Sequence, residues 1–225
     1  AKKLIRWASE LFGNQFVMST SFGIQSAVLL HLASQVVPDI PVVFIDTGYL
    51  FTETYRYSME LADTFGLNIK PYQSGVSPAQ MEALYGRIWD DEDPDKRRLY
   101  GLLRKVIPMK KAKKELEANC IMAGLRSHQT DHRAGLKYFE HDEADECFKL
   151  HPLLMWTKED IEEYFTAFDL PRHPLYHQGY TTVGDAHSSR PRAMTDKSDR
   201  DTRFGATGQQ ECGLHTEQLT LEEYE

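Results

Sequence analysis

The stretch QFVMSTSFGIQS, from Gln15 to Ser26, decides the fold class. Its first half is a short apolar run of the kind that forms a buried strand, and small polar residues follow it as a turn. Apolar residues then recur at helical spacing, at Ile24, Ala27, Val28 and Leu32. Strand, turn and helix in this order are typical of an α/β unit.

The same unit recurs along the chain. A second apolar strand over 41–45 is followed by Asp46-Thr47-Gly48 and by a helical pattern over 51–65, which Gly66 ends. Further elements are expected as a strand over 67–70, a helix over 109–118 and a strand over 120–124. Strands that alternate with helices predict an α/β fold, a single domain whose mainly parallel sheet is covered by helices on both faces.

One more helix is expected late in the chain. Its apolar face consists of Ile161, Tyr164, Phe165 and Phe168, at the i, i+3, i+4, i+7 spacing of a helix. Thr157 and Asp160 before it make a capping box, which marks where the helix begins. We predict that the four apolar residues belong to the core.

The composition changes near residue 186. From there to about residue 210, small and polar residues dominate, so little apolar area is available to fix the segment. We therefore predict a nucleotide-binding α/β domain over 1–185 and a flexible C-terminal tail over 186–225.

The overall composition is that of a globular domain. The chain has 225 residues, of which 41% are hydrophobic and 27% charged. It has no apolar run of about eighteen residues, and its start, AKKLIRW (1–7), mixes charge into the apolar stretch, unlike a signal peptide. We expect a cytoplasmic protein that does not bind a membrane.

The cysteine count argues against disulfides and thiolate metal sites. Only Cys120, Cys147 and Cys212 occur, an odd number without a C-x-x-C pair, which fits a reducing compartment. Two histidine pairs have the spacing of metal ligands on a helix: His128/His132 and His173/His177. Neither pair has an obvious third ligand, so we predict no bound metal.

The charge of the chain is acidic overall and basic in one place. The net charge of −8 argues against general nucleic-acid binding, yet Lys96–Lys114 carries nine basic residues and no acidic one. A local anion site is one interpretation. A solvated helix face is the other, and it is the commoner meaning of such a run.

Small polar residues gather in the two turns that follow the first two strands. In an open α/β sheet, ligands bind beyond the carboxyl ends of the strands, and the N-terminus of a following helix offers unpaired N–H groups to an anion. The residues that this argument selects are Ser19, Thr20, Ser21, Gly23, Ser26, Asp46 and Thr47. They predict a phosphate or sulfate site. An ordinary helix cap and turn is the alternative, since Ser, Thr and Gly form such turns in every fold class.

The chain lacks the two standard nucleotide fingerprints, G-x-x-x-x-G-K-[ST] and G-x-G-x-x-G. Ser19–Ser26 instead resembles a variant of the pyrophosphatase loop of adenylating enzymes, S-G-G-x-D-S. Gln25 stands where those enzymes keep Asp. Because an ATP-cleaving ligase needs a carboxylate near its magnesium, this difference weakens that interpretation.

A single cysteine near the C-terminus is the candidate nucleophile. Glu211-Cys212-Gly213-Leu214-His215 places a thiol three residues before a histidine. A thiol is only a few per cent thiolate at neutral pH, so a nucleophilic Cys212 needs nearby cations. The alternative, from these residues alone, is an incidental tail cysteine.

Together these segments resemble one family, the phosphoadenylyl sulfate (PAPS) reductases, over nearly the whole chain. The matching motifs, in chain order, are Ser19–Ser26, Asp46-Thr47-Gly48, Lys105-Val106-Ile107-Pro108, Gly124-Leu125-Arg126 with Gln129 and Arg133, and Glu211–His215. The resemblance implies a fold similar to the adenine nucleotide alpha hydrolases. It also implies that Lys105, Arg126 and Arg133 bind the phosphate and sulfate groups and that Cys212, assisted by His215, is catalytic.

A sister class in the same family acts on adenylyl sulfate and carries an iron–sulfur cluster on two cysteine pairs. This chain has Tyr100-Gly101 at the place of one pair and 184–188 at the place of the other. Four thiolates are needed to hold such a cluster, and the chain has three cysteines in all. The resemblance therefore implies the cluster-free class, which generally uses the 3′-phosphorylated nucleotide.

The chain departs from this class at two positions. Ile107 occupies a position that is often Glu, and Gln209 lies where a lysine commonly precedes the catalytic Glu-Cys. Four arginines of the predicted tail are candidates to supply the missing cation: Arg190, Arg192, Arg200 and Arg203.

The activity that the resemblance implies is reduction of PAPS to sulfite through an S-sulfonate on Cys212, with external thioredoxin or glutaredoxin as reductant. The family also suggests a homodimer. Three rival interpretations remain: an adenylyl sulfate reductase, an adenylating ATP pyrophosphatase, and a nucleotide-binding homologue without enzymatic activity.

Overall fold

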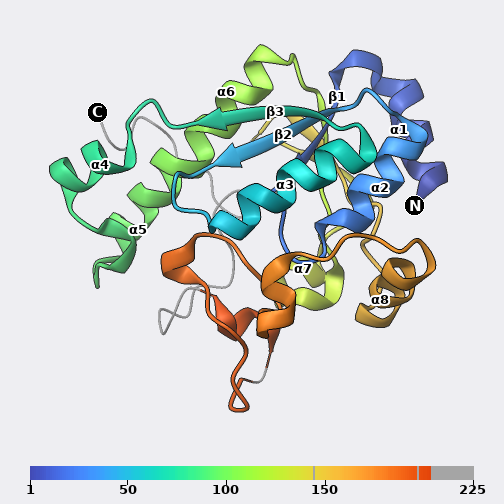
Figure 1. The fold of residues 1–225 in the computed structure, drawn as a ribbon. Helices are drawn as coiled ribbons and strands as arrows, with labels where there is room; N and C mark the ends of the chain where they lie inside the picture. Colours follow the sequence, from blue (N-terminus) through green and yellow to red (C-terminus); the bar gives the residue numbers. More distant parts are fainter. Residues whose placement is uncertain (144, 197, 204–225) are drawn as a thin grey trace.

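The computed structural model of the chain describes residues 1–143, 145–196 and 198–203. Its central element is a six-stranded sheet, of which Figure 1 labels β1, β2 and β3. The strand order is β3-β2-β1-β4-β6-β5, and every neighbouring pair is parallel except β5 with β6. The strands are β1 Phe16–Thr20, β2 Pro41–Asp46, β3 Asn68–Gln73, β4 Cys120–Met122, β5 Phe139–Asp142 and β6 Cys147–Leu150. The predicted α/β fold with a mainly parallel sheet is confirmed.

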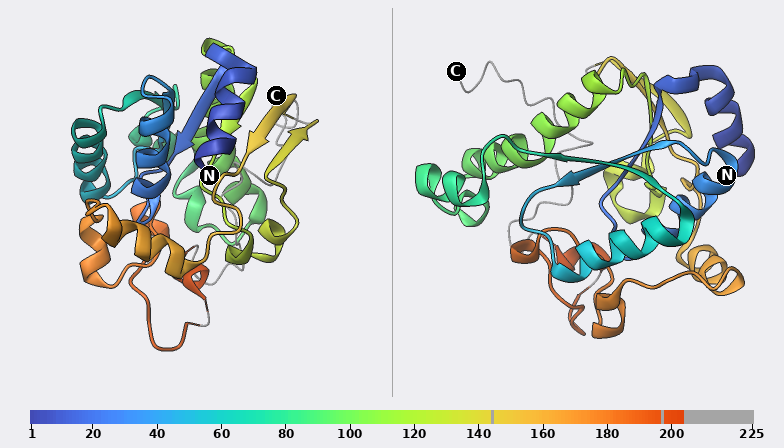
Figure 2. Two further views of the ribbon diagram at one scale, coloured as in Figure 1. Left: turned by 90° about the vertical axis from the view of Figure 1, so that its right-hand side faces the viewer. Right: turned by 45° about the horizontal axis from the view of Figure 1, so that its top comes forward.

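Helices cover both faces of this sheet (Figure 2). They are α1 Lys2–Phe12, α2 Ser26–Val36, α3 Thr52–Phe65, α4 Pro78–Tyr85, α5 Pro94–Gly101, α6 Ile107–Glu115, α7 Asp131–Ala134 and α8 Lys158–Ala167. A π-helical segment, Leu102–Val106, joins α5 to α6. Within the described part of the chain, no helix is long and apolar enough to cross a membrane.

Side chains of the central strands alternate between the two faces, as a pleated strand requires. In β1, Phe16 and Met18 join a core cluster with residues of α1, α2, α3 and α8, whereas Val17 joins a second cluster on the other face. Ala112 of α6 belongs to the second cluster. Burying one such side chain contributes roughly 1.5–3 kcal/mol. Because these strands bury side chains on both faces, they stabilise the helical layers on both sides of the sheet.

The local signals for helix ends are confirmed where the sequence contained them. Gly66 ends α3 with φ 64°, the left-handed conformation that glycine adopts without strain. Thr157 and Asp160 form the predicted capping box of α8. The prediction that Phe168 belongs to the core is wrong, because Phe168 follows the last turn of α8 and remains 46% exposed.

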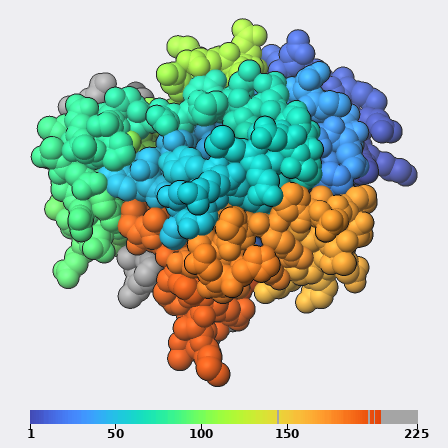
Figure 3. All heavy atoms as spheres, viewed as in Figure 1, coloured from blue at the N-terminus to red at the C-terminus, as the bar shows by residue number. Residues whose placement is uncertain are grey.

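The first part of the predicted tail, residues 186–203, has defined contacts with the domain. Ser189 and Arg203 form a β-bridge, and the Thr182 and Thr202 hydroxyls lie 3.0 Å apart. The Arg203 guanidinium donates to the Val183 carbonyl at 2.9 Å. This segment, orange-red in Figure 3, covers the lower edge of the molecule in that view. Residues 204–225 lie outside the described residues, so the domain boundary stays a prediction.

Candidate functional site

A cavity of about 260 Å³ opens at the carboxyl ends of β1, β2 and β4. Its walls come from the turn after β1, from Thr47 after β2, from 123–126 after β4, from 181–185, and from Lys105 and Arg203. Nine of the ten predicted substrate-binding residues line it: Ser19, Thr20, Ser21, Gly23, Ser26, Thr47, Lys105, Arg126 and Arg133. The sheet therefore brings together residues that are more than a hundred positions apart.

The turn between β1 and α2 is shaped by its own hydroxyl groups. The Phe22 N–H donates to Thr20 Oγ1 at 3.1 Å, and the Ser26 hydroxyl donates to the Gly23 carbonyl at 2.8 Å. Phe22 takes a positive φ of 48°, which is strained for a residue other than glycine. Its ring is fully buried edge-on against Phe44, with centroids 4.9 Å apart, and this packing holds the turn in place.

Gly23 is the glycine among the residues selected from this turn. A Cβ at this position would meet Ser21 Oγ at 3.7 Å and the Val183 carbonyl at 3.9 Å, which are ordinary contacts. The fold of the chain itself therefore does not require glycine here. The open side of the turn faces the cavity, where a missing side chain leaves room for a ligand.

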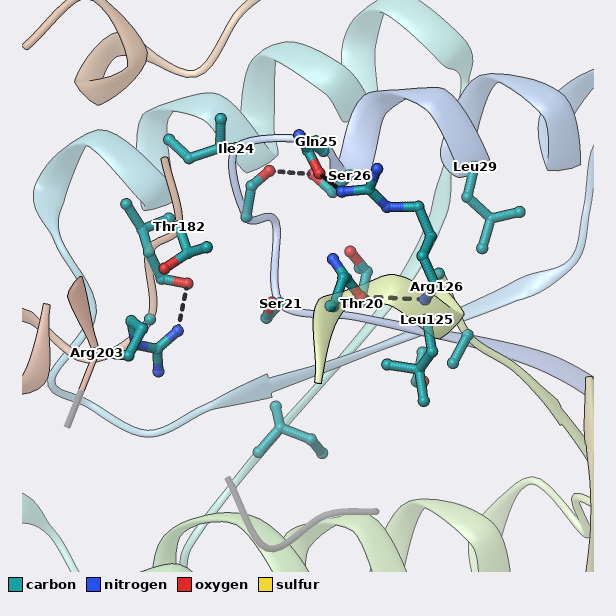
Figure 4. Close-up of a pocket in the computed structure, with 18 of the residues that line it drawn as sticks. Thr20, Ser21, Ile24, Gln25, Ser26, Leu29, Leu125, Arg126, Thr182 and Arg203 are labelled. Carbon is teal, nitrogen blue, oxygen red and sulfur yellow. Dashed lines mark hydrogen bonds between the residues drawn. The ribbon is translucent and has the colours of Figure 1, made fainter. Parts of the chain in front are cut away.

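Two buried arginines line the cavity, and Figure 4 shows one of them, Arg126, beside Gln25 and Ser26. Arg126 is 5% exposed and Arg133 7% exposed. The Arg126 guanidinium donates to Gln25 Oε1 and, at 3.2 Å, to the Thr157 carbonyl, both neutral acceptors. Gln129 Oε1 accepts from the Arg126 N–H at 3.0 Å and from the Arg133 guanidinium at 2.5 Å. Burial lowers the pKa of Arg126, yet a guanidinium stays protonated at neutral pH, so this part of the cavity wall is positively charged.

Lys105 also lines the cavity, and it forms an ion pair with Asp185, a residue that the sequence analysis did not select. Its Nζ lies 2.9 Å from Asp185 Oδ2, and the Thr47 hydroxyl donates to Asp185 Oδ1 at 2.5 Å. Burial alone would raise the pKa of Asp185, but the charge of Lys105 and the two hydrogen bonds hold it well below its ordinary value. Asp185 is therefore a buried carboxylate anion at the edge of the cavity.

Asp46 is the predicted binding residue that the cavity does not include. Its carboxylate accepts from the Gly48 N–H at 2.8 Å, from the Tyr55 hydroxyl at 2.5 Å and from the Gln73 amide at 2.6 Å. These bonds fix the turn after β2 and so position Thr47. The geometry thus favours a structural role for Asp46.

The tail arginines differ in where they lie. Arg190 pairs with Asp196 and Arg192 with Asp199, both on the exposed surface. Arg203 lines the cavity on the side opposite Arg126, beside Thr182 (Figure 4). The side chain of Arg200 lies outside the described residues. Of the candidates that the structure describes, Arg203 is the one placed to supply a cation to a bound ligand.

Two of the three cysteines are excluded as nucleophiles. Cys120 and Cys147 are fully buried in the sheet, and burial raises the pKa of both thiols, that of Cys120 to about 12. The predicted catalytic residues Cys212 and His215, and Gln209 before them, lie outside the described residues. Their roles remain predictions.

One of the histidines with metal-ligand spacing, His173, has a structural role. His173 is fully buried; its Nδ1 accepts from the Leu175 N–H at 3.2 Å, and its Nε2 lies 3.1 Å from the Thr54 hydroxyl. Among the residues that the structure describes, no group of three or more His, Cys, Asp or Glu side chains is arranged to hold a metal ion.

Sequence reasoning missed several cavity residues because their position depends on tertiary contacts. Gln25 and Gln129 stand inside quoted motifs, so the motifs contained a signal for them. The wall formed by 181–184 and the anchor Asp185 had no local signal. With these residues included, fold and cavity define an α/β protein of the class that binds nucleotides at the carboxyl ends of parallel strands.

Comparison with known proteins identifies the family. The chain belongs to the family described as the phosphoadenosine phosphosulfate reductase domain, which it matches over residues 15–191. The phosphoadenosine 5′-phosphosulfate reductase of Synechococcus sp. is 52% identical over 215 residues, covering 96% of this chain and 91% of that protein. The enzyme of the same name from Thiocapsa roseopersicina is 43% identical over 215 residues, covering 96% and 88%. The family resemblance inferred from the motifs is confirmed.

Solved structures agree with this assignment. The PAPS reductase of Candida auris, a phosphate complex, superposes with a TM-score of 0.73 at 29% identity, covering 84% of this chain and 89% of that chain. FMN adenylyltransferase of Candida glabrata superposes with a TM-score of 0.61 at 16% identity, covering 88% and 68%. The second likeness concerns the fold alone.

Proposed function

We propose that the protein reduces 3′-phosphoadenylyl sulfate to sulfite and adenosine 3′,5′-bisphosphate. One observation carries the proposal beyond family membership: Lys105, Arg126, Arg133 and Arg203 all line a single cavity at the strand ends. A ligand with several anionic groups suits such a wall, because guanidinium groups bind phosphate and sulfate in a fork.

The substrate contacts are assigned by the chemistry of each wall. The hydroxyls of Ser19, Thr20 and Ser21 and the N-terminus of α2 offer donors to phosphate oxygens. Ser26 holds the turn through its hydrogen bond to the Gly23 carbonyl. Arg126 and Arg133 supply positive charge on one side, and Arg203 supplies it on the other. Lys105 is assigned to the sulfate end, because its ammonium has donors besides the one that faces Asp185. Thr47, whose hydroxyl donates to Asp185, is assigned to hold that carboxylate beside Lys105.

Cys212 is proposed as the nucleophile. Its thiolate attacks the sulfur of the sulfate group, an S–S bond forms, and the S–O bond to the nucleotide breaks with its electron pair leaving on the phosphate oxygen. Adenosine 3′,5′-bisphosphate departs, and Cys212 carries an S-sulfonate. His215 is proposed to orient or help charge this thiol.

An external dithiol completes the reaction. One of its thiolates attacks Cys212 Sγ, which forms a mixed disulfide and expels sulfite. The second thiol, as its thiolate, then attacks the partner sulfur of the mixed disulfide, so that Cys212 is released and the dithiol becomes a disulfide. The two electrons gained by sulfur come from this dithiol. Thioredoxin or glutaredoxin is the proposed partner, and we propose no bound cofactor. An iron–sulfur cluster held by four thiolates is excluded by the count of three cysteines.

The tail must move in this scheme. Closed over the cavity, it brings Cys212 to the sulfate and excludes water; open, it presents the modified thiol to the dithiol. We further propose a cytoplasmic homodimer whose C-terminal tail, predicted over 186–225, carries Cys212.

The test begins with substrate and product. Sulfite release is measured with PAPS and with adenylyl sulfate, each with thioredoxin, and faster turnover of PAPS is expected. Pyrophosphate release from ATP would instead support the adenylating interpretation. Full sulfite production by Cys212→Ser would contradict the mechanism.

Mass spectrometry tests the intermediate directly. After mixing with PAPS and no thioredoxin, the protein is expected to gain one sulfonate, located on the peptide that contains Cys212. A protein that turns over PAPS with thioredoxin but never carries this adduct would require a different first step.

A further inference from the structure

Asp185 connects three separate segments at the edge of the cavity. Its carboxylate bonds to Lys105 and Thr47, and it is 1% exposed. Its backbone forms a β-bridge with Leu50, and the following N–H, that of Ala186, donates to the Tyr49 carbonyl at 2.7 Å. The residue is thus fixed by main-chain contacts independently of its side chain.

Lys105 reaches this carboxylate from the π-helical segment Leu102–Val106. π-helical turns are rare and are found frequently at functional sites. The neighbouring Arg104 donates to the Val76 carbonyl at 2.7 Å and does not line the cavity, whereas Lys105 does. The Lys105 ammonium also lies 5.5 Å from the centre of the Tyr100 ring. Its side chain is 10% exposed, so Asp185 is its main charged partner in a largely buried place.

The other titratable groups that face this pair do not change charge near neutral pH. Burial and the charge of Asp185 raise the pKa of Tyr100, and burial with hydrogen bonding raises that of Tyr55. Burial lowers the pKa of His187 to about 4, against the opposite effect of Asp185. Arg203, on the same side of the cavity, stays protonated.

We propose that Asp185 is a positioning residue: it keeps the Lys105 ammonium charged and directed into the cavity, where Lys105 meets the anionic substrate. The inference rests on the proposed function for the identity of that substrate. An ammonium has three donors, so the contact with Asp185 leaves donors for a sulfate or phosphate oxygen. Without the carboxylate, a buried amine loses its charge more readily, because burial penalises the charged form.

The test is Asp185→Asn, which retains the shape of the side chain and an oxygen acceptor for Thr47 but removes the negative charge. The quantity to measure is the ratio of kcat/KM for PAPS in the variant to that in the wild type, at pH values from about 6 to 9. This ratio cancels the titration of the nucleophilic thiol. It is expected to fall with rising pH, because the amine of Lys105 then has no carboxylate beside it to keep it charged.

A second variant isolates the cause. In Asp185→Asn combined with Lys105→Arg, the cation cannot deprotonate, so the ratio is expected to lose its dependence on pH even if its value is low. The matched control is Asp145→Asn, which removes an aspartate paired with Lys113 at 3.1 Å and Lys149 at 2.5 Å, none of which lines the cavity. Its ratio is expected to stay flat.

A folded Asp185→Asn variant whose ratio is independent of pH would overturn the inference. If that variant does not fold, Asp185→Glu replaces it, which keeps the charge but displaces it by one methylene. Its kcat is expected to fall about tenfold, and its kcat/KM relative to the wild type is expected not to depend on pH. Wild-type kcat in Asp185→Glu would then overturn the positioning role. Failure of the wild type itself to release sulfite from PAPS would contradict the proposed function, which is a separate result.

Discussion

Gln25 and Arg126, 101 positions apart, share a hydrogen bond that joins the start of α2 to the loop after β4. Adenylating enzymes keep an aspartate where this chain has Gln25. A neutral partner leaves the charge of the buried Arg126 available to an anionic ligand, whereas a carboxylate would neutralise it. The pair therefore suggests why a multiply anionic nucleotide suits this pocket.

Gln25→Glu tests that relationship. The variant is expected to bind adenosine 3′,5′-bisphosphate about tenfold more weakly, because a loss of about 1.4 kcal/mol is modest for a charge-assisted contact. Isothermal titration calorimetry measures the dissociation constant. Gln35→Glu, an exposed change on the same helix, is the control and is expected to leave it unaltered. Equal affinity in Gln25→Glu and the wild type would show that Arg126 does not act through its charge.

The three cysteines are expected to differ in reactivity. Cys120 and Cys147 are fully buried, and burial raises their pKa, so iodoacetamide at pH 7.5 should spare both in the folded protein. Cys212, as the proposed nucleophile, should be alkylated first, with loss of activity in step. Peptide mass spectrometry over time distinguishes the three sites. Inactivation that follows labelling of Cys120 or Cys147 would argue against this assignment.

Gly66 provides a test of the fold. Gly66→Ala is expected to lower the free energy of unfolding by about 1 kcal/mol, because alanine at φ 64° is strained while a Cβ there would meet no atom within 4 Å. Urea denaturation measures the change. Gly75→Ala is the matched control: it also meets no atom within 4 Å, and Gly75 has no positive φ. A loss of the same size in both variants would contradict the conformational explanation.

His173 predicts a pH dependence of stability. Burial lowers its pKa from the ordinary 6.5 to about 4, so between these values the unfolded chain binds a proton that the folded chain does not. The free energy of unfolding therefore falls as the pH drops from about 6.5 to 4, by about 3 kcal/mol for a shift of this size. His173→Gln should show a smaller decrease over this range, as measured by urea denaturation at each pH.

The exposed His177 is the control for that experiment. His177→Gln should leave the decrease as in the wild type. If the free energy of unfolding decreases equally with pH in His173→Gln and in the wild type, burial of the His173 imidazole is not the cause of the decrease.

The sequence predicted the elements whose signal is local. Apolar runs gave β1, β2 and β4, glycine gave the end of α3, and Thr157 with Asp160 gave the start of α8. The antiparallel pair β5 and β6 was not predicted, because four-residue strands have too few positions for an alternating pattern to stand out. Helix α1 was also not predicted.

In the candidate site, too, the residues that were predicted are those with a local signal in the sequence. Hydroxyl-rich turns and family motifs selected nine residues that the fold places around one cavity. Asp185 was not selected, because its role depends on contacts with Lys105 and Thr47, 80 and 138 positions away in the chain. Asp46 was selected by its place after a strand, although its hydrogen bonds go to the turn and to neighbouring side chains.

The walls of the cavity come from segments spread between Ser19 and Arg203, and this sets an order for synthesis on the ribosome. A nascent chain acquires the turn after β1 early, but Lys105 finds its carboxylate only once residue 185 has emerged. Until then the ammonium has no buried partner, and the pocket lacks one wall. The complete set of charged walls therefore exists only in a chain that has been synthesised as far as Arg203.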